Sequence, residues 1–281
     1  MQYMITSKAQ LNDGFAMPRF GLGTFLSEAG QATQDAVSWA LAAGYRHIDT
    51  ARIYGNERDV GWAVRESGIP RSDIFITTKV WNDDQGYDST LRACEASLKR
   101  LRMDYVDLYL IHWPVAGRRS ETWKALVRLK QSGEVRSIGV SNYMIRHLEE
   151  LLSETDIVPA VNQFELSPFL QRKKLVAYCR ERGILVESYS TLGRGQKLTD
   201  VRLAAIGRKY GKTPAQVALR WALQSDIAVI PKSVHKERIL ENAAIFDFDI
   251  APDDMRAMAE LDEDYSVIPA AWDPETSDQW A

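Results

Sequence analysis

Cysteine and histidine are scarce in this chain, and their placement argues against disulfide bonds and metal sites. The only two cysteines, Cys94 and Cys179, each lie among apolar residues at helical spacing, which predicts buried thiols and no disulfide framework. The four histidines, at 47, 112, 147 and 235, show no HExxH or other close metal-ligand spacing. We therefore predict a protein without a metal site.

The chain also lacks long apolar runs and an excess of charge of one sign. No run of ~18 apolar residues is present, and nothing at the start resembles a signal peptide. A formal net charge of −3, without a long run of Lys or Arg, provides no basic field for nucleic acid or anionic lipid. We expect a cytoplasmic protein that binds a small molecule and neither membrane nor nucleic acid.

Several motifs of nucleotide and acyl chemistry are missing. There is no GxSxG elbow, no GxxxxGKS/T loop and no GxGxxG that opens a helix, since Gly21-Leu22-Gly23 lies inside a predicted strand. No tyrosine stands four residues before a lysine, which is the spacing of another class of dehydrogenase. A two-half nucleotide-binding sheet is therefore excluded.

What the chain does contain is a regular alternation of helical and strand-like segments. Its 281 residues are 45% hydrophobic and 26% charged, as in an ordinary globular protein. Predicted helices end at or near glycines such as Gly44, Gly133 and Gly183, and a strand follows each. The helices before the last strand cover a segment ending at Gly44 and then about 57–68, 89–101, 122–131, 146–153 and 174–182. The eight predicted strands are 20–24, 45–50, 74–79, 105–113, 135–142, 159–166, 184–190 and 227–233.

Eight strands that alternate with helices predict a closed parallel barrel, an α/β fold of the (β/α)8 or TIM type. Residues 7–17 surround the turn Asn12-Asp13-Gly14 and predict an N-terminal β-hairpin. A helix at about 252–261 leads into an aperiodic tail, which either packs across a barrel end or frays. No linker-like tract divides the chain, so we expect one domain over residues 1–281 and a monomer.

Four chemical side chains fall at the carboxyl ends of predicted strands, where barrels of this type build their active sites. They are Asp49, Lys79 and His112, each at a strand end, and Tyr54 in the loop after Asp49. We expect Lys79 to lower the pKa of the Tyr54 phenol and Asp49 to neutralise the buried ammonium. His112 is then placed to orient a substrate oxygen. Such a set predicts proton transfer to a developing alkoxide.

A second group of polar residues follows the last predicted strand. Lys232 and Ser233 stand at its exit and Arg238 in the start of the next helix. The last loops of such barrels are the usual phosphate site, and Lys with Arg would clamp a dianion.

The segments GYRHIDTARIYGNE, TTKVWNDDQG, LIHWP, IGVSN, VNQFEL, SYSTLG and IPKSVHKERILEN resemble those of the aldo-keto reductase family from about residue 15 to 250. The resemblance implies a (β/α)8 barrel that binds NADPH in extended form and reduces aldehydes or ketones. It makes Tyr54 the general acid, tuned by Lys79 and Asp49, with His112 orienting the carbonyl. The Lys and Arg pair favours NADPH over NADH.

The resemblance also assigns the cofactor contacts. Tyr189 would stack on the nicotinamide, while Ser141, Asn142 and Gln163 would bind its carboxamide. Lys232, Ser233 and Arg238 would hold the 2′-phosphate, with Glu241 and Asn242 on the adenine. Further implied cofactor contacts are Gly23, Thr24, Ser190, Leu192 and Val234.

Two departures from the family pattern lie near the cofactor region, and the substrate pocket is aromatic. Ser167 stands where many members have His, and Thr191 where many have Pro. The DDQG run and short middle loops resemble the bacterial branch that reduces small dicarbonyls and keto sugars, including 2,5-diketo-gluconate and methylglyoxal reductases. The predicted pocket residues are Phe25, Trp81, Trp113 and Trp272.

Two other functions stay open at this stage. A Schiff-base aldolase would use Lys79, and a non-catalytic redox-sensing or structural module would keep only the NADPH site. We interpret His47 and Arg52, which flank Asp49, as strand-facing or solvated residues without a role in the chemistry.

Overall fold

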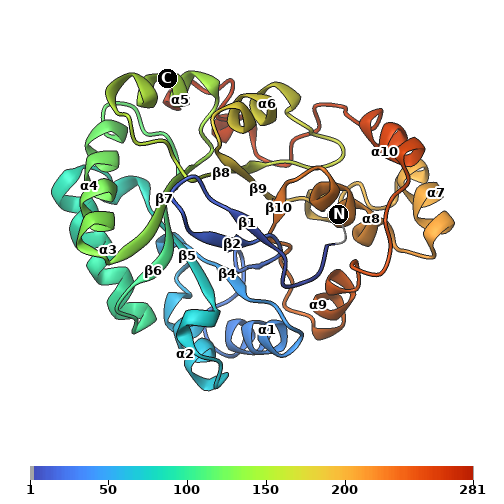
Figure 1. Cartoon of the computed structure of the whole chain (residues 1–281), viewed down its shortest axis with the longest axis horizontal. Coiled ribbons are helices and arrows are strands. Elements are labelled where there is room, and N and C mark those ends of the chain that lie inside the picture. Colours follow the sequence, from blue (N-terminus) through green and yellow to red (C-terminus); the bar gives the residue numbers. More distant parts are fainter. Residues whose placement is uncertain (1–2, 281) are drawn as a thin grey trace.

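A computed structural model describes residues 3–280 and contains a closed barrel of eight parallel strands (Figure 1). Their order follows the chain from β3 to β10, and the first and last are joined by the parallel bridges Phe20 to Val229 and Gly23 to Lys232. The strands are β3 (Leu22–Gly23), β4 (His47–Asp49), β5 (Phe75–Val80), β6 (Val106–Ile111), β7 (Val135–Ser141), β8 (Val161–Glu165), β9 (Leu185–Tyr189) and β10 (Ala228–Val229). The predicted (β/α)8 fold is confirmed.

Helices surround the barrel and cover the outer faces of its strands (Figure 1). Every residue of β5 and β6 is buried, as expected for strands with one face toward helices and the other toward the barrel interior. The helices are α1 (Gln31–Ala42), α2 (Glu57–Glu66), α3 (Tyr87–Leu101), α4 (Arg119–Ser132), α5 (Ile145–Glu154), α6 (Lys173–Glu181), α7 (Val201–Tyr210), α8 (Pro214–Gln224), α9 (Lys236–Ala243) and α10 (Pro252–Ala259). Among residues 3–280, none of these helices is long and apolar enough to cross a bilayer.

Two glycines at the start of the barrel, Gly21 just before β3 and Gly23 within it, serve close packing. A Cβ atom on Gly21 would lie 2.8 Å from the imidazole of His47, and one on Gly23 would lie 2.7 Å from the carbonyl oxygen of Ile230. Both distances are too short for any side chain. The glycine pair therefore lets β3 approach His47 and the last strand, which closes the barrel.

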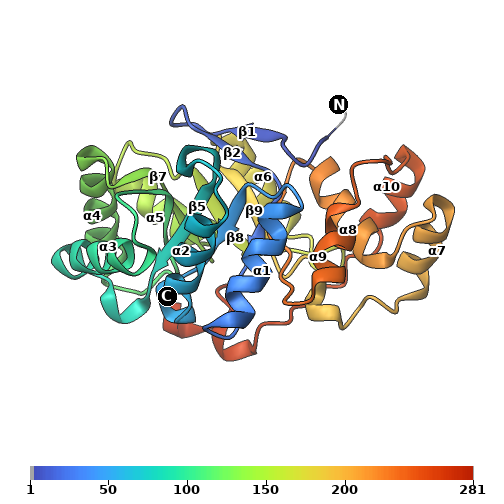
Figure 2. The same cartoon turned by 90° about the horizontal axis from the view of Figure 1, so that it is seen from below.

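The two ends of the barrel are covered by different segments (Figure 2). The predicted hairpin, β1 (Lys8–Gln10) with β2 (Ala16–Pro18), covers the amino-terminal end, where Asn12 Nδ2 donates to the carbonyl oxygen of Pro159 just before β8. The C-terminal segment after α10 lies at the opposite end and includes the short 3-10 turns η5 (Ala270–Trp272) and η6 (Asp278–Trp280). Of the two outcomes expected for the tail, packing across a barrel end is the one observed.

The last part of the barrel differs from the predicted alternation. Two helices, α7 and α8, separate β9 from β10, and the predicted strand 227–233 is reduced to the two residues of β10. Pro231 lacks an N–H, so the strand ladder is interrupted there. Among the described residues, the ladder continues beyond Pro231 only as the isolated bridge between Gly23 and Lys232.

Candidate active site

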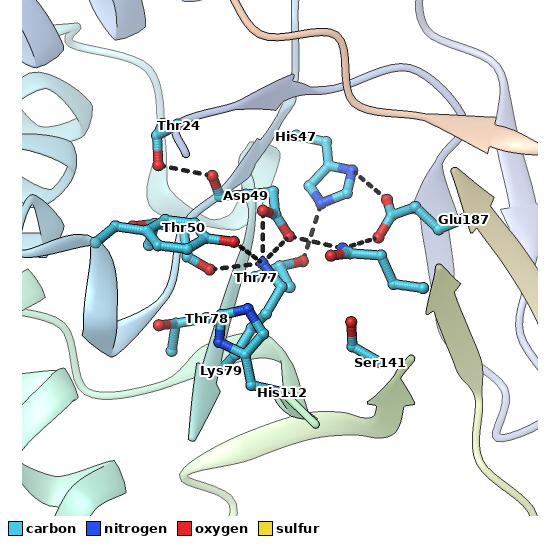
Figure 3. A network of polar contacts seen from close by, with 12 residues as sticks. Thr24, His47, Asp49, Thr50, Thr77, Thr78, Lys79, His112, Ser141 and Glu187 are labelled. Carbon is cyan, nitrogen blue, oxygen red and sulfur yellow. Dashed lines mark hydrogen bonds and ion pairs between the residues drawn. The ribbon is translucent and has the colours of Figure 1, made fainter. Parts of the chain in front are cut away.

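The three side chains predicted at the strand ends, Asp49, Lys79 and His112, converge at the carboxyl-terminal end of the barrel (Figure 3), and Tyr54 lies beside them. Lys79 Nζ lies 2.7 and 2.9 Å from the two oxygens of Asp49 and 3.0 Å from the carbonyl oxygen of Thr50. It lies 3.4 Å from Tyr54 Oη, because Tyr54 sits in the short turn η1 (Arg52–Tyr54) directly after β4. The His112 ring lies 5.6 Å from the Tyr54 ring, between ring centroids, in an edge-on arrangement.

Lys79 is charged in this site. Burial is the largest single influence and lowers the pKa of Lys79, but the charge and hydrogen bond of Asp49, together with Tyr54 and Glu187, outweigh it and raise the pKa. Burial raises the pKa of Asp49, and the ammonium of Lys79 opposes that effect. We assign the proton to Lys79, because three oxygen acceptors surround Nζ and a neutral amine would leave the carboxylate without its cation.

We expected Lys79 to lower the pKa of the Tyr54 phenol, but the net shift of this pKa is upward. The ammonium does act to lower the pKa of the Tyr54 phenol, but burial acts more strongly and raises it above its usual value. The physical reason is that Asp49 already neutralises most of the charge on Lys79, while the phenolate would lose its hydration. Tyr54 is therefore a protonated phenol at neutral pH.

His112 is neutral and follows β6 directly. Burial and the charge of Lys79 hold the pKa of His112 well below its ordinary value. Its buried Nδ1 has no hydrogen-bond partner among residues 3–280. A neutral imidazole carries a single N–H, so the ring can donate one hydrogen bond into the site.

The side chains predicted to face a nicotinamide lie beside this group. Asn142 Nδ2 donates to the carbonyl oxygen of His112 at 2.9 Å and to Ser141 Oγ at 3.1 Å, and Tyr189 Oη donates to Asn142 Oδ1 at 2.6 Å. Asn142 adopts the left-handed conformation, with φ of 63°, at the exit of β7. Gln163 Nε2 donates to Asp49 Oδ2 at 2.9 Å, which ties the predicted carboxamide site to the acid–base group.

The residues predicted to bind phosphate form a looser set. Lys232 Nζ donates to the carbonyl oxygen of Leu26 at 3.1 Å, so it reaches across to the loop after β3. Partial burial lowers the pKa of Lys232. Ser233 Oγ accepts from the backbone N–H of His235 at 3.0 Å, and Arg238 is exposed in the first turn of α9.

The other predicted cofactor residues come from the end of β3, from the loops after β3, β9 and β10, and from α9. Gly23 ends β3, and Thr24 Oγ1 donates to the carbonyl oxygen of Asp49 at 2.9 Å. Glu241 Oε1 accepts from Thr213 Oγ1 at 2.7 Å, and the neighbouring Asn242 is buried. Ser190 has a left-handed φ of 51°, and Leu192 and Val234 pack partly buried against the core.

Aromatic rings form a wall beside the acid–base group. Trp81 and Trp272 stack with centroids 6.1 Å apart, and Phe25 lies 5.1 Å from the Tyr54 ring. Trp113 lies 5.2 Å from Trp272. The three predicted tryptophans are thus close together, although Trp272 comes from the tail, and Phe25 joins the site through Tyr54.

Sequence reasoning missed Trp280, which stacks on Trp113 with centroids 5.0 Å apart. Its carbonyl oxygen accepts from Arg119 Nη1 at 3.1 Å and lies 2.8 Å from His147 Nε2. These contacts anchor the tail on α4 and α5. A second tryptophan in an aperiodic tail was the available signal.

Sequence reasoning also missed a buried group behind Asp49. His47 was interpreted as strand-facing or solvated, and it is fully buried inside the barrel, with Nε2 2.9 Å from Thr77 Oγ1 and Nδ1 3.6 Å from Glu187 Oε1 (Figure 3). Arg52 is partly solvated, as expected, and pairs with Asp84 at 3.0 Å. A glutamate directly after the apolar residues Ile184, Leu185 and Val186 in the strand 184–190 was the signal for Glu187.

The two departures from the family pattern are accommodated locally. Thr191 Oγ1 lies 2.6 Å from Ser188 Oγ, and the Ser167 backbone pairs with Leu170. In the described part of the chain, neither side chain is hydrogen-bonded to Asp49, Tyr54, Lys79 or His112.

Comparison with known proteins gives the family of this barrel enzyme. The model of the aldo/keto reductase family matches residues 19–263. Glyoxal reductase of Bacillus subtilis is 48% identical over 269 residues, which cover 96% of this chain and 98% of that protein. The 9,11-endoperoxide prostaglandin H2 reductase of Trypanosoma cruzi is 48% identical over 260 residues, which cover 92% of each chain. A solved structure of a Gox0644 variant in complex with NADPH superposes with a TM-score of 0.91, at 45% identity, covering 97% of this chain and 98% of the other.

The chain belongs to the aldo/keto reductase family. This confirms the predicted family and its class, an oxidoreductase, and the NADPH complex of a 45% identical neighbour agrees with the predicted cofactor.

Proposed function

We propose that this protein is an NADPH-dependent reductase of aldehydes and ketones, in which Tyr54 protonates the carbonyl oxygen. When bound, NADPH supplies the hydride. The observation that carries the proposal is the convergence of Tyr54 Oη, Lys79 Nζ and Asp49 at the mouth of the barrel, with the neutral His112 ring edge-on to the phenol. This set contains a proton donor and a charge to stabilise the conjugate base, as carbonyl reduction requires.

The residues of this chain fit the proposed cofactor. Asn142 is held by His112 and Tyr189, and Gln163 is held by Asp49, so their amides are oriented before a ligand arrives. Lys232 and Arg238 supply two cations at the far end, in line with the 2′-phosphate that distinguishes NADPH. In this assignment, the carboxamide is bound by Ser141, Asn142 and Gln163.

Each catalytic side chain has one task in the proposed reaction. His112 donates one hydrogen bond to the carbonyl oxygen and orients it. Tyr54 Oη releases its proton to that oxygen as negative charge develops there, and the Lys79 ammonium 3.4 Å away stabilises the resulting phenolate. Asp49 keeps Lys79 charged and in place.

The aromatic wall supports small or flat carbonyl compounds as substrates. Phe25, Trp81, Trp113 and Trp272 offer apolar surface around the polar centre, a composition typical of small-molecule pockets. Small dicarbonyls are our first choice, because glyoxal reductase of Bacillus subtilis is 48% identical to this chain. Keto sugars come second.

The test is Tyr54→Phe assayed with NADPH and a carbonyl panel of glyoxal, methylglyoxal, an aromatic aldehyde and a keto sugar. We expect kcat to fall about 10²- to 10⁴-fold, the usual contribution of a general acid, while the Kd for NADPH stays within about twofold. Turnover that survives within a few-fold would overturn the role of Tyr54. Absence of turnover in the wild type, with NADPH still bound, would favour the non-catalytic module.

A Schiff-base aldolase would need Lys79 as a free amine. Its three oxygen acceptors and complete burial count against this function. Trapping of substrate by borohydride without a cofactor would support it.

A further inference from the structure

Glu187 is a buried carboxyl group that the proposed reaction leaves unused. It lies in β9 and is completely shielded from solvent. Its Oε2 accepts a hydrogen bond from Gln163 Nε2 at 2.6 Å. Its Oε1 faces His47 Nδ1 at 3.6 Å, and neither of these two atoms has a hydrogen-bond partner among residues 3–280 (Figure 3). Burying a carboxyl group is costly, so its position calls for a reason.

Gln163 is held by two carboxyl groups at once. The same Nε2 that donates to Glu187 also donates to Asp49 Oδ2 at 2.9 Å, so both amide protons are used. The terminal torsion of a glutamine is soft when it has one anchor, whereas two anchors fix the plane of the amide. Rotating the amide by half a turn would bring its oxygen against two carboxyl oxygens.

The amide oxygen of Gln163 is consequently directed away from both carboxyl groups. Gln163 Oε1 accepts no hydrogen bond in the described part of the chain. This oxygen is also not fully buried. It is therefore available as an acceptor to a ligand. A primary carboxamide, with two N–H donors, is the matching chemistry.

We propose that Glu187 is a positioning residue of this reductase, which acts through Gln163 by holding its amide oxygen toward the carboxamide N–H of the nicotinamide. The inference rests on the proposed function, because it deepens the cofactor site assigned there. Glu187 itself touches neither cofactor nor substrate.

The protonation states around Glu187 suit this role. Burial, and then the charge of Asp49, raises the pKa of Glu187 to about 8, while burial and Lys79 lower the pKa of His47 to about 3. A neutral Glu187 carboxyl accepts from Gln163 with one oxygen and directs its O–H toward His47 Nδ1 with the other. The charged groups facing it are Asp49 and Lys79, which remain paired with each other because Glu187 adds no second negative charge.

The test compares Glu187→Met, which removes the acceptor at similar length, with Glu187→Gln, which keeps an acceptor oxygen. The readout is the Kd of NADPH and of its reduced 3-acetylpyridine analogue, which lacks the N–H donors. For Glu187→Met we expect the NADPH Kd to rise about fivefold, the size of one neutral hydrogen bond, and the analogue Kd to change less than about twofold. Glu187→Gln should bind NADPH within about twofold of the wild type. Glu57→Gln, at another buried carboxyl that bonds Thr78 and Arg100, is the matched control and should leave both values unchanged.

Equal weakening of both cofactors, or no weakening of NADPH binding, by Glu187→Met would overturn the inference. Failure of the wild type to bind either cofactor would instead overturn the proposed function. If Glu187→Met does not fold, the inference is tested by amide proton exchange in the wild type, labelled with ¹⁵N in its glutamine side chains. Both side-chain amide protons of Gln163, assigned by their absence in Gln163→Met, should exchange slowly with water, and exchange of either as fast as in the exposed Gln131 would overturn the inference.

Discussion

Lys79 and Asp49 form an ion pair inside the barrel, with Nζ 2.7 Å from Oδ1, and both side chains are buried. They come from neighbouring parallel strands, β5 and β4, so the sheet itself sets their distance. A buried pair of this kind stabilises little as a whole, but removing one partner leaves a charge without compensation.

For this reason Asp49→Asn should lower the free energy of unfolding by about 3–5 kcal/mol, measured by urea denaturation at pH 7. The double variant Asp49→Asn with Lys79→Met should recover a large part of that loss, because no unpaired charge remains buried. A double variant as unstable as the sum of the two single variants would contradict the assignment of a charged pair.

The cation pair at the end of the barrel predicts the choice between NADPH and NADH. Lys232→Ala and Arg238→Ala should each raise the KM for NADPH about tenfold or more, since charge-assisted hydrogen bonds to a phosphate are lost. The KM for NADH should change less than about twofold. Arg208→Ala, at an exposed arginine of α7, is the control. Equal efficiency of the wild type with both cofactors would remove the basis for a 2′-phosphate site.

Glu187 should make the stability of the protein depend on pH. Burial and Asp49 raise its folded pKa to about 8, whereas an unfolded glutamate titrates near ~4.3. Between these values the folded state binds more protons than the unfolded state, so stability falls as the pH rises from about 4.3 to 8, on the order of a few kcal/mol.

Urea denaturation of the wild type and Glu187→Gln at pH 5 and pH 8 measures this effect. The variant should lose less stability between the two values. His47, whose folded pKa of about 3 lies below its unfolded value, acts in the opposite direction: it adds stability as the pH rises toward about 6.5. That contribution is common to both proteins. Parallel pH profiles would show that Glu187 is ionised in the folded state at neutral pH.

The tail should contribute to substrate binding through Trp272. Trp272→Ala removes a ring that stacks on Trp81 and contacts Trp113, so the KM for an aromatic aldehyde should rise several-fold. The kcat and the Kd for NADPH should stay within about twofold, because the ring contributes to ground-state binding. Trp62→Ala, at an exposed tryptophan of α2, serves as the control. An unchanged KM would place Trp272 outside the pocket.

The local pattern of the chain was sufficient to predict the barrel and the positions of Asp49, Tyr54, Lys79 and His112 in it. Helical and strand periodicities alternate along the sequence, and in a parallel barrel every strand end lies on one rim, so residues at strand ends must meet there. The same pattern predicted a hairpin within residues 7–17, which the structure shows at residues 8–18, and most helix bounds to within a few residues. It did not reveal α7 and α8 between the last two strands.

Properties that depend on burial and on distant contacts were decided by the tertiary structure alone. The pKa of Tyr54 is raised because the folded barrel removes water from the phenol, which outweighs the nearby ammonium. The partners of Gln163 and the stacking of Trp280 on Trp113 join segments far apart in the chain. Local periodicity determines which face of an element is buried, but the strength of a charge or a hydrogen bond depends on which other elements close around it.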